Sequence, residues 1–180
     1  GSVAAAKSPV VLKGKMARVI DAHAHCFFQT GLDLMRSEAA SILPPVKGVP
    51  EHFLQQADPL KARLEAMDQM GVDMQVLSIN PFWYKKDRET AQAICKVHNE
   101  SFAELVASHP RRFAAFASIA MQFPELAVQQ LEEAVKKYGL VGAAIGGSVA
   151  GHDFCHPEYH PVLAKAQELG VTLFIHPQST

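Results

Sequence analysis

The 180-residue chain has no excess of charge of either sign and no long apolar run. Its 17 Lys and Arg residues nearly balance its 18 Asp and Glu residues, so nothing in the charge favours a nucleic-acid partner. Its apolar runs are far shorter than the roughly 20 residues that a membrane-spanning helix needs. We therefore expect binding to neither nucleic acid nor membrane.

Cysteine is scarce as well. Cys26, Cys95 and Cys155 are odd in number and widely spaced, which argues against a disulfide framework. This usage fits a reducing compartment, so we expect the protein to be cytoplasmic.

The N-terminal stretch carries no sign of a secretion signal. Gly1-Ser2 resembles an expression scar, and residues 1–15 lack the apolar core of a signal peptide. We interpret residues 1–17 as a tail and residues 18–180 as one domain.

Strand-like and helix-like segments alternate along this domain. Short apolar, β-prone runs occupy residues 18–23, 74–79, 113–119, 142–145 and 171–175. Apolar residues recur at spacings of three and four over residues 59–71, 87–108, 124–138 and 161–169. Such alternation predicts an α/β fold in which helices connect parallel strands.

Two parallel architectures compete, an open doubly wound sheet and a (β/α)8 barrel. The Gly-x-Gly-x-x-Gly signature of many open sheets is missing after the first strand. Histidines instead close the first and fifth strands, where barrels carry their active-site side chains. We favour the barrel, which usually needs roughly 250 residues. We therefore interpret the chain as the N-terminal portion of a (β/α)8 TIM barrel, about five βα units, with its C-terminal part missing.

The most informative motif is Val19-Ile20-Asp21-Ala22-His23-Ala24-His25. Because side chains alternate along a strand, His23 and His25 point to the same face. Neutral imidazole suits zinc and several other divalent metals, and His176 ends another predicted strand. With nine histidines in the chain, a chance surface pair is the alternative.

Aromatic residues follow the second predicted strand, in the loop that contains Phe82 and Trp83. In a barrel this loop lies at the catalytic mouth, where it can form a wall for a conjugated substrate. Packing on the barrel rim is the alternative, and the sequence leaves both open.

Three more histidines, His152, His156 and His160, follow the fourth strand. Since His156 and His160 each precede a proline, we interpret them as residues at the start of a helix. We do not predict a second metal site there.

The motif Ile20-Asp21-Ala22-His23-Ala24-His25 resembles the opening motif of the amidohydrolase superfamily. Further segments resemble its amidohydrolase-related branch, which contains 2-amino-3-carboxymuconate-6-semialdehyde decarboxylase and the nonoxidative aromatic-acid decarboxylases. These segments are residues 67–72, 109–113, 121–127 and 173–177. The resemblance extends over about residues 20–177.

The resemblance implies a metal-dependent barrel and a homodimer. It places His23, His25 and His176 at the positions of the metal ligands, around one divalent ion. We expect zinc first and manganese second. The fourth strand ends at Ile145-Gly146-Gly147 without the lysine that bridges two metals in other members. A catalytic histidine and a metal-binding aspartate would follow Thr180, so no catalytic residue is assigned.

The chain also departs from the semialdehyde decarboxylase. Residues 48–51, which align with its carboxylate-gripping arginine, contain none, and Arg36 lies earlier in the same loop. Gln178 stands where that enzyme has a tryptophan. We include Gln178 with Phe82 and Trp83 as candidate substrate-binding residues, and we expect a different substrate.

The predicted function is a metal-dependent nonoxidative decarboxylase, a carbon–carbon lyase. Its expected substrate is a small unsaturated or aromatic carboxylic acid. One alternative is a metal-dependent hydrolase or hydratase of the same superfamily that acts on a related acid. Another is an inactive fragment or a binding protein.

Overall fold

The computed structural model of the protein describes residues 10–35 and 59–176. Its strands are β1 (Val11–Leu12), β2 (Lys15–Met16), β3 (Ile20–His25), β4 (Met74–Ser78), β5 (Phe113–Ala115), β6 (Ala117–Ser118), β7 (Gly142–Gly146), β8 (Ser148–Val149), β9 (His152–Asp153) and β10 (Thr172–His176). Its helices are α1 (Gln29–Met35), α3 (Pro59–Met70), α4 (Arg88–Ser108), α5 (Pro124–Lys136) and α6 (His160–Leu169), with short 3₁₀ helices η3 (Phe82–Lys85) and η4 (Pro157–Tyr159).

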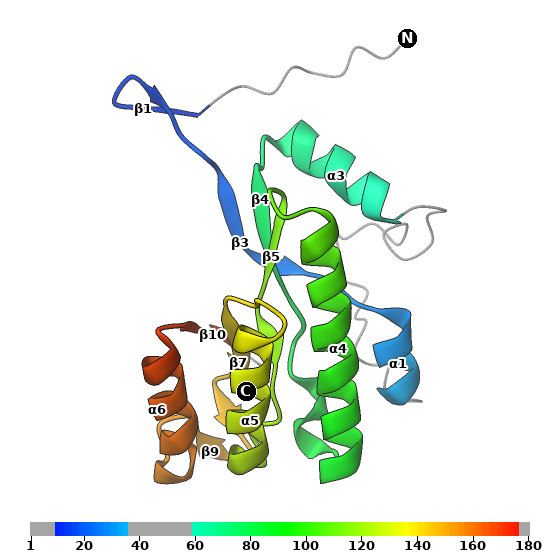
Figure 1. The fold of residues 1–180 in the computed structure, drawn as a ribbon, viewed down its shortest axis with the longest axis vertical. Coiled ribbons are helices and arrows are strands. Elements are labelled where there is room, and N and C mark those ends of the chain that lie inside the picture. The colour runs from blue at the N-terminus through cyan, green and yellow to red at the C-terminus, as the bar shows by residue number, and fades with distance from the viewer. Residues whose placement is uncertain (1–9, 36–58, 177–180) are drawn as a thin grey trace.

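The longer strands form two parallel sheets (Figure 1). One has the order β3–β4–β5, and the other has the order β6–β7–β10. Phe116 alone separates β5 from β6 in the sequence, so one interrupted strand joins the two sheets. The predicted α/β fold with parallel sheets is confirmed, and it is consistent with part of a (β/α)8 barrel. The number of βα units stays a prediction.

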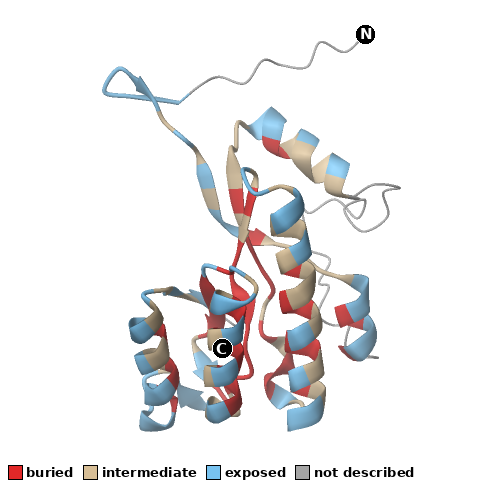
Figure 2. Cartoon of the chain, in the orientation of Figure 1, coloured by how far each residue is buried: buried red, intermediate tan, exposed pale blue. Residues whose placement is uncertain are grey.

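The core lies between these strands and the faces of α4 and α5 that pack against them (Figure 2). The helix α4 begins at its N-cap Asp87, whose carboxylate accepts the Thr90 N–H at 2.9 Å. Its buried side chains recur at helical spacing, at Ala91, Ile94, Cys95, His98 and Phe102. His98 is thus a buried histidine on an apolar helix face.

The pairing of β7 with β10 depends on a glycine. Gly142 lies opposite Thr172 and has a φ of +148°, which side-chain-bearing residues rarely adopt. A Cβ atom at this position would lie 1.9 Å from the Thr172 carbonyl oxygen. The two strands therefore approach closely only because residue 142 has no side chain.

Part of the predicted N-terminal tail is ordered into a hairpin. The strands β1 and β2 pair antiparallel through the turn residues Lys13 and Gly14, at φ +50° and +74°. Two consecutive positive φ angles are the requirement of a type I′ turn. The hairpin extends away from the sheets (Figure 1).

Membrane-spanning helices and disulfide bonds, neither of which the sequence predicts, can be checked in the fold. The described part of the chain contains no helix with the length and apolarity to cross a membrane. Cys26, Cys95 and Cys155 are all free thiols, as expected from their spacing.

Candidate metal centre

Two strands that are distant in the sequence bring three histidines together. His23 and His25 lie on β3, and His176 ends β10. The Nε2 atoms of His23 and His25 are 3.0 Å apart, and those of His25 and His176 are 3.3 Å apart. The ring centroids of His23 and His176 are separated by 4.7 Å. The three residues named from the sequence therefore converge at one point.

The donor set fits a divalent metal ion. One ligand nitrogen from each histidine lies within 4.8 Å of the other two, so all three can reach a common centre. Zinc is bound by imidazole nitrogen at about 2.0–2.1 Å, and three protein ligands leave a position for water or substrate. The arrangement supplies imidazole nitrogens and the number of protein ligands that such a site needs.

The protonation state of His25 supports this fit. Burial, followed by the proximity of His176, His23 and Arg63, lowers the pKa of His25 from 6.5 to about 4. The ring is therefore neutral at physiological pH, and its lone pair is available to a metal.

A bulge in β3 lies directly beneath the two histidines. Asp21 pairs with Gln75 and Ala24 pairs with Leu77, so β3 advances three residues while β4 advances two. The extra residue falls within 22–23. Bulges bend a strand and re-aim its side chains, and this one bends β3 where the two histidines begin.

Arg63 of α3 holds this bent segment. Its guanidinium donates to the backbone carbonyl of His25 at 2.5 Å and to Gln75 Oε1 at 2.9 Å. The Gln75 amide donates to Asp21 Oδ2 at 3.1 Å, and Asp21 Oδ1 accepts the backbone N–H of His23 at 3.1 Å. The Arg63 guanidinium thus contacts the His25 backbone directly. It is linked to the His23 backbone through the side chains of Gln75 and Asp21.

Neither Arg63 nor Gln75 was predicted from the sequence. A signal existed at Gln75, a polar residue inside the apolar strand Met74–Ser78, where it is buried. Arg63 interrupts the apolar face formed by Leu60, Leu64 and Met67, and this interruption was the second available signal.

Comparison with known proteins identifies the family. The sequence profile of an amidohydrolase family matches residues 20–180. The chain belongs to this amidohydrolase family.

Two curated relatives of this amidohydrolase are decarboxylases. It is 33% identical over 143 residues to the gamma-resorcylate decarboxylase of Polaromonas sp., covering 75% of this chain and 44% of that protein. It is 32% identical over 117 residues to the 2-amino-3-carboxymuconate-6-semialdehyde decarboxylase of Dictyostelium discoideum, covering 64% of this chain and 33% of that protein.

A solved structure with the same fold contains a metal. The dihydroxybenzoic acid decarboxylase of Polaromonas sp. JS666, with bound manganese and the inhibitor 2-nitroresorcinol, superposes with a TM-score of 0.75 at 31% identity. The match covers 92% of this chain and 51% of that one. The amidohydrolase chain therefore spans about half the length of the relatives it matches, or less.

Aromatic rings lie beside two of the three histidines. The ring of Phe27 stacks on His25 at 6.2 Å, and Phe174 meets His23 edge-on at 5.2 Å. Phe116 stacks on Phe174 at 5.3 Å. Phe174 was not predicted from the sequence as a neighbour of the histidines. It precedes His176 by two residues and so lies on the same face of the strand. The three-histidine group therefore has an apolar side.

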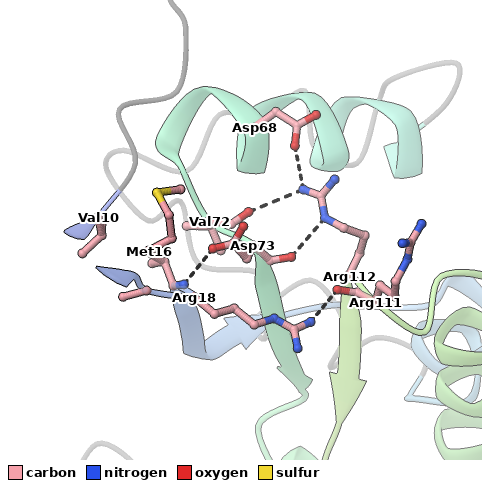
Figure 3. A pocket seen from close by; sticks show the side chains of 10 residues that line it. Val10, Met16, Arg18, Asp68, Val72, Asp73, Arg111 and Arg112 are labelled. Atoms are coloured by element: carbon pink, nitrogen blue, oxygen red, sulfur yellow. Dashed lines mark hydrogen bonds and ion pairs between the residues drawn. The ribbon is translucent and has the colours of Figure 1, made fainter. Parts of the chain in front are cut away.

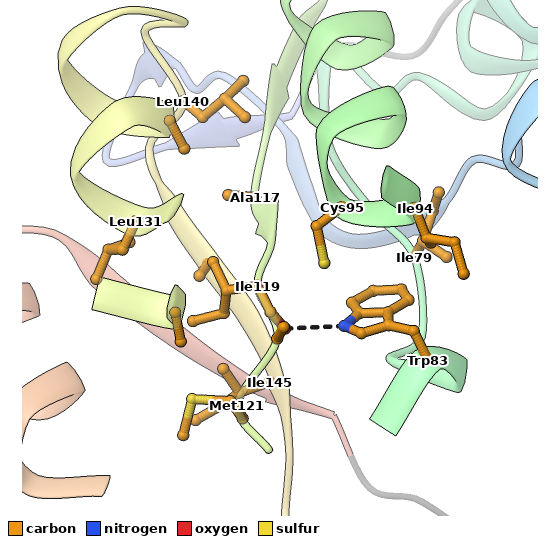
Figure 4. Close-up of a cluster of buried hydrophobic side chains, with 14 of the residues drawn as sticks. Ile79, Trp83, Ile94, Cys95, Ala117, Ile119, Met121, Leu131, Leu140 and Ile145 are labelled. Atoms are coloured by element: carbon orange, nitrogen blue, oxygen red, sulfur yellow. Dashed lines mark hydrogen bonds between the residues drawn. The ribbon is translucent and has the colours of Figure 1, made fainter. Parts of the chain in front are cut away.

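Trp83 requires a correction. Its side chain is fully buried, and its indole N–H donates to the Ile119 carbonyl at 2.9 Å within the core (Figure 4). A side chain with no exposed surface cannot contact a substrate, so the alternative of structural packing holds for Trp83. The loop forms the 3₁₀ helix η3, which turns the indole inward.

The other candidate substrate-binding residues differ from Trp83. Phe82 is half-buried and packs against the edge of the core, so its substrate role stays a prediction. Gln178 lies outside the described residues, as do Arg36 and residues 48–51.

A hollow of about 620 Å³ lies at the other end of the sheet, where β3, β4 and β5 begin (Figure 3). Arg18 donates to the Arg111 carbonyl at 2.8 Å. Arg112 pairs with Asp68 at 2.8 Å and donates to the Asp73 carbonyl at 3.1 Å. These contacts tie the strand starts together, and polar groups at this end of a barrel serve stability.

Proposed function

We propose that this amidohydrolase is a metal-dependent nonoxidative decarboxylase that acts on a small aromatic or unsaturated carboxylic acid. The observation that carries the proposal is the convergence of His23, His25 and His176 at the ends of two parallel strands. The names of the curated relatives and of the solved structure support a decarboxylase over other members of the family.

We propose His23, His25 and His176 as the ligands of one divalent ion. Three imidazole nitrogens favour zinc, and the manganese in the related structure makes that ion the second choice. Held by these residues, such an ion would supply Lewis-acid stabilisation of developing negative charge.

The chain's own residues have distinct roles in this proposal. Neutral His25 offers its lone pair at physiological pH, and Arg63 fixes the backbone that carries it. Phe27 and Phe174 form an apolar side to the centre. In such surroundings the charge interactions of a bound carboxylate are stronger than they are in water. We propose that Phe82 adds to this wall at the end of β4.

Metal analysis tests the ligand assignment. Protein loaded with Zn²⁺ and desalted should lose one equivalent of metal in the His23→Ala/His25→Ala variant. The His160→Ala variant removes an exposed histidine outside the three-histidine group and should keep the wild-type content. An unchanged metal content in the double variant would refute the assignment.

Carbon dioxide release tests the reaction. The full-length gene product, stripped of metal and reloaded with Zn²⁺ or Mn²⁺, is assayed with gamma-resorcylate and other hydroxybenzoates. We expect release that falls at least about a hundredfold without metal, since metal stabilisation of charge contributes several kcal/mol. Hydrolysis or hydration of related acids without carbon dioxide release would contradict the lyase proposal and support the alternative of a hydrolase or hydratase.

A further inference from the structure

A second group of ligand-type side chains lies on the segment that follows β7. His152 belongs to β9, His156 precedes η4, and Glu158 lies within η4. The Nδ1 atom of His152 is 2.5 Å from Glu158 Oε1, and the Nδ1 atom of His156 is 3.1 Å from the same oxygen. One ligand atom from each residue lies within 4.8 Å of the other two.

The backbone around these residues is held in place. His152 pairs with Val149 in the β8–β9 hairpin, and the His156 N–H donates to the Asp153 carbonyl at 2.9 Å. The buried side chain of Tyr159 donates its hydroxyl to the Val149 carbonyl at 3.1 Å. The hairpin and the start of α6 are thus connected beside the three side chains.

We propose that His152, His156 and Glu158 form a second, surface site for a divalent transition-metal ion. This site is separate from the three-histidine centre and shares no ligand with it. A bound ion would tie the β8–β9 hairpin to the start of α6.

The chemistry of the donor set selects the kind of ion. Two imidazole nitrogens and one carboxylate oxygen suit zinc and the neighbouring transition metals better than magnesium or calcium, which prefer oxygen alone. The spacing His152-x-x-x-His156 is also common among zinc ligands. Three protein ligands leave one or more positions to water, so we expect weaker binding here than at a closed structural site.

Small movements are sufficient for binding. With bonds of about 2.0–2.1 Å, ligand atoms around a tetrahedral zinc lie roughly 3.3 Å apart. The two Nδ1 atoms now lie 2.5 and 3.1 Å from Glu158 Oε1, so shifts of less than about an ångström separate these distances from that geometry. The three side chains are exposed and can rotate to adjust. On binding, each imidazole would carry its proton on Nε2 and leave the Nδ1 lone pair for the metal.

The proposed site differs from the expectation that the histidines after the fourth strand form no second metal site. His156 does precede a proline at the start of a helix, but its ring also stacks on His152 with centroids 4.4 Å apart. Glu158 was not predicted from the sequence to take part in a metal site. His160 is not among the residues brought together here.

A Zn²⁺ titration of the metal-stripped protein, followed by calorimetry, tests the site. We expect two equivalents per chain in the wild type and one in the His152→Ala/His156→Ala variant. The His160→Ala variant is the matched control, because it removes a neighbouring exposed histidine, and it should still bind two. Far-UV circular dichroism checks that each variant is folded.

The His23→Ala/His25→Ala variant separates this inference from the proposed function. If the wild type binds one equivalent that disappears only in His23→Ala/His25→Ala, the surface site is wrong and the three-histidine centre stands. If the single equivalent disappears only in His152→Ala/His156→Ala, the surface site stands and the proposed metal centre fails. Wild-type stoichiometry in the His152→Ala/His156→Ala variant overturns the inference in every case.

Discussion

The guanidinium of Arg63 donates a hydrogen bond to the backbone carbonyl of His25, a residue 38 positions earlier in the chain. The arginine lies on α3 and the histidine on β3, so this contact fixes the helix against the strand that carries two of the three histidines. Arg63 also reaches the backbone of His23 through Gln75 and Asp21. It therefore holds the geometry of a candidate ligand pair without being a ligand.

Replacing Arg63 by Met should weaken zinc binding at the three-histidine centre by about tenfold, because groups that orient ligands typically contribute 10–100-fold in affinity. Loss of its two charge-assisted hydrogen bonds should also lower the free energy of unfolding, by roughly 1.5–3 kcal/mol. Zinc competition with a chromophoric chelator measures the affinity, and urea unfolding of the metal-free protein measures the stability.

Two variants show whether Arg63 acts on ligand geometry or only on stability. Arg63→Lys keeps the charge but not the two-pronged donor, so its affinity should lie between wild type and Arg63→Met. Arg111→Met, an exposed arginine at the opposite end of the sheet, should leave the affinity unchanged. A variant of Arg63 that is less stable but binds zinc as wild type does would rule out the positioning role.

The three histidines could be grouped from the sequence because strand alternation and strand ends are local properties. His23 and His25 are two residues apart, and His176 ends an apolar run. Parallel barrel strands present their ends on one side, and the family resemblance predicts that these three residues meet there. The structure agrees in bringing their nitrogens within hydrogen-bonding distance.

The features that could not be predicted from the sequence depend on contacts between distant segments. The bulge in β3 exists only relative to the register of β4. The burial of Trp83 depends on the position of Ile119, a residue 36 positions later. Neither relationship has a local signature, because periodicity identifies the face of an element but not what covers it.

The Gly142→Ala substitution should be strongly destabilising. Its Cβ atom would overlap the Thr172 carbonyl oxygen, and its φ of +148° is strained for alanine. We expect a loss of roughly 2–4 kcal/mol in the free energy of unfolding, from backbone strain and steric overlap together. Zinc affinity should fall too, since displacement of β10 moves His176.

Gly147 provides the matched control for this substitution. It follows β7 directly, and a Cβ atom there would meet no heavy atom within 4 Å. Gly147→Ala should change the free energy of unfolding by less than about 1 kcal/mol. Equal unfolding midpoints for the two variants in urea would contradict the assigned role of Gly142.

The Trp83→Phe variant tests the core role of Trp83. Loss of the indole N–H leaves the buried Ile119 carbonyl without this partner, which should lower the free energy of unfolding by about 1–3 kcal/mol. Zinc affinity should stay at the wild-type value, because the side chain has no exposed surface. Phe82→Leu, at the half-buried neighbour, should cost less stability. A Trp83→Phe protein of wild-type stability would contradict the core assignment.

Protonation of His98 should make stability depend on pH. The ring is buried on α4, with its Nδ1 atom 3.2 Å from the Ser118 hydroxyl. Burial lowers its pKa from 6.5 to about 4. Between these values the unfolded chain binds a proton that the folded chain excludes, so the free energy of unfolding falls as the pH decreases through this range. The loss from this one group should reach about 3 kcal/mol near pH 4 and should be absent above about pH 7.

The comparison with His98→Asn isolates this contribution. Asparagine can still bond to Ser118 but does not titrate, so the variant should lose less stability than wild type on acidification. Urea unfolding of both metal-free proteins between about pH 7.5 and about pH 4.5 measures the difference in slope. His25, with a pKa also lowered to about 4, contributes to both proteins and cancels in that difference. Parallel slopes, or an NMR titration that places the His98 pKa at its ordinary value, would show that the folded protein admits the proton.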